Sequence, residues 1–103
     1  VINPDAEIGR HCIINTSAVI EHDCKIGDFA HISPHAALAG NVSVGEGSHV
    51  GIGASGIQGV TIGKWATIGA GSVIIKDVPD FATVVGNPGR IIKLNKNIQN
   101  NER

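Results

Sequence analysis

The chain has 103 residues and a formal net charge of -1, which suits one domain and gives no indication of a nucleic acid or an anionic membrane as partner. No apolar run approaches the roughly 20 residues that span a bilayer, and no stretch has the pattern of a secretory signal. Glycine is frequent at 14 residues, leucine is rare, and isoleucine and valine abound, so the composition favours β-structure with many tight turns.

A repeat of six residues dominates the chain. Residues 1–78 divide into thirteen consecutive blocks, from VINPDA at the start to VIIKDV at the end. The second position is Ile, Leu or Val in every block but one, where Gly56 stands, and the sixth is always Ala, Cys, Ser or Val. This pattern predicts a β-solenoid in which each block is a short strand and a turn. We expect the second and sixth positions to point inward and glycines at positions three to five to shape the turns, whereas a β-sandwich would show a period of two.

The blocks resemble the left-handed parallel β-helix of the hexapeptide-repeat acyltransferases. The resemblance implies an all-β domain over residues 1–78, in which three blocks form one triangular coil and residues 18 positions apart stack at about 4.8 Å. One corner of this map carries charges of both signs, which predicts a solvated ladder of ion pairs worth at most about 1 kcal/mol each. That corner contains Arg10, Asp28, Glu46 and Lys64.

One outward face of the map is mostly apolar, and it contains Val1, Val19, Ala37, Ser55 and Val73. Outward apolar strips on a narrow prism suggest association between subunits. The resemblance implies a homotrimer with active sites in the clefts between neighbouring prisms. His22 and His31 are half a coil apart and therefore lie on different sides of one prism, so they meet only across such a cleft.

The stretch SAVIEHDCKIGDFAHISPHA at 17–36 carries three of the five histidines. Transfer of an acetyl group from acetyl-CoA needs a base with a pKa near neutrality, for which histidine is suited. It also needs a carboxylate that orients the imidazole and a backbone N–H aimed at the thioester oxygen. His22 has Asp23 beside it, with Glu21 as an alternative partner, and Gly40 stacks directly above His22.

The segments IEHDC, AHIS and AGNV are similar to those of bacterial acetyltransferases that modify amino sugars or sialic acid. By that resemblance His22 is the general base, Asp23 orients it and His31 is a second site histidine. Gly40 donates its N–H to the acetyl carbonyl. The apolar corner at Ile52 and Ala70 would carry the pantetheine arm, the acceptor would be a sugar amine or hydroxyl, and no metal would be required.

After Val78 the period breaks, and residues 79–103 are expected to form a C-terminal cap and a mobile tail. The stretch DVPDFATVVGNPGRIIK resembles the closing segment of many hexapeptide acetyltransferases, which lies near the CoA nucleotide. Arg90 and Lys93 would then meet its phosphates. The resembled enzymes also carry an N-terminal nucleotide-sugar-binding α/β domain, and nothing in this sequence corresponds to it.

Other interpretations stay open at this point. A γ-carbonic anhydrase shares the solenoid but needs three histidines around one zinc ion, for which His31, His35 and His49 are the candidates; His49 is equally a wall or a spacer of the site. A structural or ice-binding solenoid would need a regular threonine ladder, which four threonines do not supply. Cys12 and Cys24 both occupy the small sixth position, and we interpret them as inward free thiols in a cytoplasmic protein.

Overall fold

The computed structural model describes residues 1–94, and most of its strands are only two residues long. The strands are β1 (Glu7–Ile8), β2 (Ile13–Ile14), β3 (Val19–Ile20), β4 (Lys25–Ile26), β5 (His31–Ile32), β6 (Ala37–Leu38), β7 (Ser43–Val44), β8 (His49–Val50), β9 (Ser55–Gly56), β10 (Thr61–Ile62), β11 (Thr67–Ile68), β12 (Val73–Ile74), β13 (Ala82–Val85) and β14 (Arg90–Leu94). Each strand is followed by a turn that starts the next one, as the hexapeptide period predicts.

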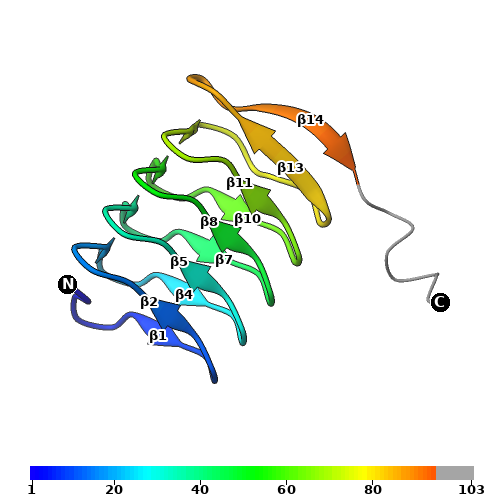
Figure 1. Cartoon of the computed structure of the whole chain (residues 1–103). Helices are drawn as coiled ribbons and strands as arrows, with labels where there is room; N and C mark the ends of the chain where they lie inside the picture. The colour runs from blue at the N-terminus through cyan, green and yellow to red at the C-terminus, as the bar shows by residue number, and fades with distance from the viewer. Residues whose placement is uncertain (95–103) are drawn as a thin grey trace, which may run out of the picture.

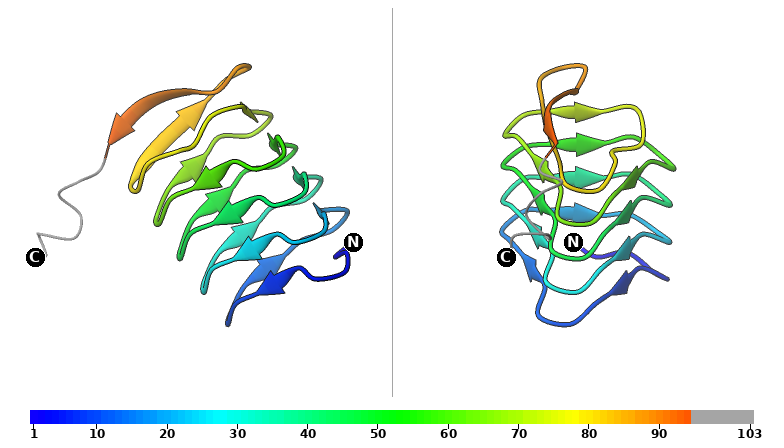
Figure 2. Two further views of the ribbon diagram at one scale, coloured as in Figure 1. Left: turned by 180° about the vertical axis from the view of Figure 1, so that it is seen from behind. Right: turned by 90° about the vertical axis from the view of Figure 1, so that its right-hand side faces the viewer.

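Every third strand pairs in parallel, so the chain winds into a three-faced solenoid whose coils stack from the N-terminus to β14 (Figure 1, Figure 2). Face one contains β3, β6, β9 and β12, and face two contains β1, β4, β7 and β10. Face three contains β2, β5, β8, β11, β13 and β14. The predicted solenoid of about four coils is therefore confirmed. The register is also confirmed through Val73, which pairs with Ser55.

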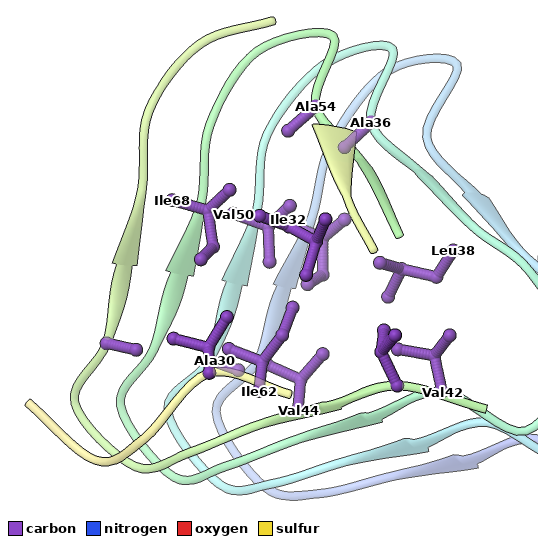
Figure 3. Packing of buried hydrophobic residues seen from close by; sticks show 14 of the residues in the cluster. Ala30, Ile32, Ala36, Leu38, Val42, Val44, Val50, Ala54, Ile62 and Ile68 are labelled. Atoms are coloured by element: carbon purple, nitrogen blue, oxygen red, sulfur yellow. The ribbon is translucent and has the colours of Figure 1, made fainter. Parts of the chain in front are cut away.

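The interior is filled by the second and sixth positions of the blocks (Figure 3). In each two-residue strand the first side chain points outward and the second inward, because side chains alternate along a strand. Fully buried second positions include Ile20, Ile32 and Leu38, and each such side chain contributes about 1.5–3 kcal/mol. The small sixth positions, such as Ala30 and Ala54, lie where the chain bends and leave room for these larger residues.

The turns depend on the fifth position of the first twelve blocks, where the backbone has a positive φ whether or not the residue is glycine. Asp23 has φ 60°, Asn41 61° and Trp65 54°. Glycine at the third position has a different role: a Cβ on Gly45 would lie 2.6 Å from the carbonyl carbon of Gly63 in the next coil. The expectation that all these glycines serve the turn conformation was therefore wrong for position three, where close stacking of coils excludes a side chain.

The last coil is shorter than the others. Val78 forms a bridge with Ile62, and Thr83 pairs with Thr67, at a spacing of 16 rather than 18 residues. The regular six-residue register therefore ends before Val78, and β13 continues face three as a further parallel strand. β14 then folds back antiparallel to β13 and forms the edge of that sheet. The tail predicted beyond this strand falls on residues 95–103, outside the described part.

The predicted ladder of ion pairs at the charged corner is wrong. The Asp28 carboxylate accepts a hydrogen bond from the backbone N–H of Arg10 at 2.7 Å, and Asp80 does the same for Lys64 at 2.7 Å. Within residues 1–94 the one ion pair is His22 with Asp23. The short aspartate side chain reaches the backbone N–H of the neighbouring turn more easily than it reaches the flexible end of an arginine or lysine side chain. The corner is therefore held by hydrogen bonds from backbone to side chain.

Two further expectations concern the cysteine thiols and the possibility of a membrane-spanning helix. Cys12 and Cys24 are free thiols, and burial raises the pKa of Cys24 above its ordinary value. Across residues 1–94 the structure has no helix with the length and apolarity needed to cross a bilayer.

Candidate active site

The corner between faces one and two carries His22 and Asp23, in the turn between β3 and β4. The His22 Nδ1 atom lies 3.1 Å from Oδ2 of Asp23, and the two side chains are 58% and 51% exposed. Because Asp23 occupies the left-handed fifth position of its block, its side chain turns back toward the preceding residue. A carboxylate on Nδ1 favours the tautomer that protonates this nitrogen and leaves Nε2 as the basic atom.

The alternative partner, Glu21, has a different contact. Its Oε1 atom accepts a hydrogen bond of 2.8 Å from Nδ2 of Asn3 in the coil below. The sequence left the choice between Asp23 and Glu21 open. In the structure only Asp23, of these two, contacts the His22 ring.

Gly40 stacks on His22, and its lack of a side chain is what admits the imidazole. An added Cβ on Gly40 would lie 2.8 Å from Cε1 and 2.9 Å from Nε2 of His22. The Gly40 N–H has no hydrogen-bond acceptor within residues 1–94, which is also true at the same position of other blocks, such as Glu46 and Ile52. At Gly40 this N–H is available to a ligand, and no side chain separates the residue from the His22 ring.

His31 lies on face three, on the opposite side of the prism from the His22 corner. Its ring stacks on that of His49, with 4.5 Å between the centroids and 12° between the planes; we call this pair the histidine stack. Nε2 of His31 lies 3.0 Å from Nδ2 of Asn15, and Nε2 of His49 lies 2.9 Å from Oγ of Ser33. The sequence did not indicate either hydrogen-bond partner, although the 18-residue spacing of the two histidines predicted that they stack.

A shallow groove of about 450 Å³ runs along face three beside the histidine stack. It brings His31 together with the predicted pantetheine residues Ile52 and Ala70, both of which are exposed. Its lining consists of Asn15, His31, Ser33, Pro34, His49, Gly51, Ile52, Thr67, Ile68 and Ala70. The groove has apolar and hydrogen-bonding groups but no carboxylate, which suits a flexible chain with amide groups.

The predicted phosphate-binding residues lie at the C-terminal end of the same face. Arg90 and Lys93 are exposed on β14, where they pair with Val85 and Thr83 of β13. One chain therefore presents two separate half-sites. His22, Asp23 and Gly40 form one of them, and the face-three groove with β14 forms the other.

The zinc alternative finds no support in the arrangement of donors. Among residues 1–94, no three or more His, Cys, Asp or Glu side chains gather in a way that could hold a metal ion. His31 and His49 are stacked face to face, and His35 lies on the following turn with a φ of 61°. The three histidines proposed for a carbonic anhydrase site therefore do not converge.

Known proteins are similar to this chain in sequence and fold. The family model for the bacterial transferase hexapeptide (six repeats) matches residues 5–40. A His-to-Ala mutant of GDP-perosamine N-acetyl transferase from Caulobacter crescentus, in complex with CoA and GDP-perosamine, has 48% sequence identity and a TM-score of 0.89 over 89% of this chain and 44% of its own. The acetyltransferase domain of PglB from Neisseria gonorrhoeae, in complex with acetyl coenzyme A, has 43% identity and a TM-score of 0.89 over 89% of this chain and 45% of its own.

Serine acetyltransferase from Neisseria gonorrhoeae is more distant, at 29% identity and a TM-score of 0.84 over 90% of this chain and 40% of its own. The chain thus spans less than half the length of each of these three structures. No curated protein matches the sequence. The repeat, the coil topology and the family-model match agree on a hexapeptide-repeat solenoid, and the chain is similar to bacterial acetyltransferases with this fold. Among the structures named, its sequence identity is higher to GDP-perosamine N-acetyl transferase and to the PglB acetyltransferase domain than to serine acetyltransferase.

Proposed function

We propose that this chain forms the catalytic solenoid of an acetyltransferase that moves the acetyl group of acetyl-CoA to an amine or hydroxyl of a nucleotide-linked sugar. The observation that carries the proposal is the arrangement at Gly40, where a residue with no side chain and an N–H without an acceptor stacks on a histidine already bonded to a carboxylate. Relatives crystallised with CoA and GDP-perosamine, or with acetyl coenzyme A, support the same substrate classes.

In the proposed reaction the acceptor nitrogen or oxygen attacks the thioester carbonyl directly. Nε2 of His22 removes the proton from the attacking group, while Asp23 holds Nδ1–H and stabilises the imidazolium. The Gly40 N–H donates to the carbonyl oxygen as negative charge develops there. The bond from nitrogen or oxygen to carbon forms, the carbon–sulfur bond breaks, and the CoA thiolate leaves and takes up a proton. A histidine in this role contributes about 10²–10⁴-fold in rate.

The acyl donor would lie along the face-three groove. Its pantetheine arm would pack on Ile52 and Ala70, with His31 alongside, and its phosphates would reach Arg90 and Lys93 on β14. Arginine and lysine bind phosphate through charge-assisted hydrogen bonds, and both side chains here are exposed.

The two half-sites lie on opposite sides of one prism, so the proposal requires a homotrimer in which the His22 corner of one chain faces the groove of the next. Face one supports this assembly, because it presents an outward apolar surface. Ile57 and Ile75, which follow β9 and β12, are each 44% exposed. A shallow recess of about 350 Å³ between Val19, Ala37 and Ile57 lies on the same face.

The test is calorimetric titration of the chain with acetyl-CoA, together with light scattering to fix the assembly state. The expected result is a trimer that binds one acetyl-CoA per chain with micromolar affinity. Acetyl transfer is then followed by thiol release with a nucleotide-linked amino sugar, with His22→Ala as the inactive reference. A demonstrated trimer without donor binding, or a His22→Ala variant within fivefold of the unaltered chain, would refute the proposal.

A further inference from the structure

The histidine stack lies on the surface of the solenoid, where the fold does not require two aromatic side chains to pack together. His31 and His49 are directly paired in the register of β5 and β8, and both occupy the outward first position of their strands. The same column holds Ile13 in β2 and Thr67 in β11, so the fold accepts a non-aromatic residue at this position. Two histidines with parallel rings therefore need an explanation other than packing of the core.

The hydrogen bonds of the stack define the state of His31. The atom that faces its Nε2 is Nδ2 of Asn15, an amide nitrogen that can only donate. Nε2 of His31 must then accept, and the neutral ring carries its proton on Nδ1. His49 has a comparable contact from Nε2 to Ser33, whose hydroxyl either donates or accepts, so only His31 has its tautomer fixed by its partner.

The surroundings of the stack disfavour a positive charge. Two imidazolium rings 4.5 Å apart would repel each other, and no carboxylate lines the groove. Partial burial lowers the pKa of His49 below its ordinary value, and the neighbouring His31 lowers it further. The other charged groups on this face are Arg90 and Lys93, which are cations on β14, while His35 lies on the next turn outside the groove lining.

We propose that His49 is a positioning residue that holds the His31 ring flat, with Nδ1–H as the donor that the ring offers to a ligand in the face-three groove. This inference rests on the proposed function for the identity of that ligand, an acyl donor. His49 acts through the ring of His31: the stack fixes the ring plane, and Asn15 fixes which nitrogen carries the proton.

The experiment observes His31 directly, by long-range proton–nitrogen NMR of the imidazoles in the purified chain, and compares three variants. His49→Phe keeps a flat ring but removes the second titrating group, and His49→Ala removes the stack. His35→Asn is the matched control, since it deletes an exposed histidine at a turn where asparagine tolerates a positive φ. Acetyl-transfer kinetics are measured on the same samples.

In the unaltered chain, His49→Phe and His35→Asn we expect the Nδ1–H tautomer of His31. In His49→Ala we expect averaged signals from both tautomers, and a KM for acetyl-CoA raised about two- to tenfold with a smaller change in kcat, the size expected for loss of one stacked ring pair. Asn15→Ala, which leaves the rings in place, should also release the tautomer.

An unchanged His31 tautomer in His49→Ala would overturn the proposal whatever Asn15→Ala does, as would an equal effect of His35→Asn. Failure of the proposed function has a different signature. If no variant transfers acetyl groups but the tautomer still changes in His49→Ala, acetyl transfer is refuted and the positioning of His31 by His49 is supported.

Discussion

Gly40→Ala is the substitution that tests the site most sharply, because the structure predicts where the added carbon goes. The new Cβ would lie 2.8 Å from Cε1 and 2.9 Å from Nε2 of His22, well inside ordinary contact distance. The backbone at Gly40 does not have a positive φ, so alanine is compatible with its conformation. The strain is therefore relieved by the His22 side chain, which is 58% exposed and free to swing outward.

The expected effect is on catalysis rather than on folding. His22 has to move by about 1 Å to restore ordinary contact, and a displacement of that size costs on the order of 10²-fold in rate when it affects a reacting group. The free energy of unfolding should change by less than about 1 kcal/mol, since only an exposed ring shifts. Acetyl-CoA binding should change little, because the groove lies on the opposite face.

Gly56→Ala is the matched control. A Cβ there would lie 3.5 Å from Leu38 Cδ2 and 3.5 Å from Val60 Cγ2, which is ordinary contact inside the solenoid. We expect this variant to keep its activity and its stability. The assays are thiol release for kcat and chemical denaturation for stability. A Gly40→Ala protein that folds normally and retains activity within fivefold would refute the role assigned to the His22–Gly40 contact.

Three further predictions follow from the same structure. His22→Ala should lower kcat by about 10²–10⁴-fold without loss of stability, because it removes the base and leaves the core intact. Thiol release measures the rate and chemical denaturation measures the stability. A variant that loses its activity because it unfolds would contradict this prediction. Ile57→Glu should leave a folded chain that neither trimerises nor binds acetyl-CoA, since it places a charge on the apolar face one; light scattering and calorimetry measure both, and a stable trimer would assign the interface elsewhere. The pKa of His49 is lowered in the folded chain, so at a pH near the ordinary histidine pKa the unfolded chain binds more protons than the folded chain. Stability is therefore lost as the pH falls through the ordinary pKa of histidine. Between pH 7.5 and 5.5 the melting temperature of His49→Phe should fall less than that of the unaltered chain.

The period of six was enough to predict the core and the location of His22 relative to Gly40. Inward positions are set by strand alternation and coil length, both of which the sequence repeats many times. The same period indicated that His22 and His31, which are half a coil apart, lie on different sides of the prism. The assignment of roles came from resemblance, and the structure adds the contact with Asp23 and the N–H of Gly40 without an acceptor.

The sequence did not predict the hydrogen bonds made by side chains outside the core, because these depend on the conformation of each exposed side chain. Asp28 bonds to a backbone N–H rather than to Arg10's side chain, and Asn15 bonds across the coils to His31. Each of these choices is a competition between several exposed partners of similar energy, which a periodic pattern does not decide. The short last coil was missed because Val78 fits the sixth position of one register and the second position of the other.

Because the coils of this solenoid repeat along its axis, the same site could be built at a different coil. Gly40 stands over His22 because the two positions are one coil apart, and the same relation recurs between Gln58 and Gly40. Asn41 already has the left-handed backbone of Asp23, with φ 61° against 60°. A histidine at position 40 below a glycine at 58, with aspartate at 41, would therefore rebuild the same constellation one coil higher while the buried side chains stay as they are.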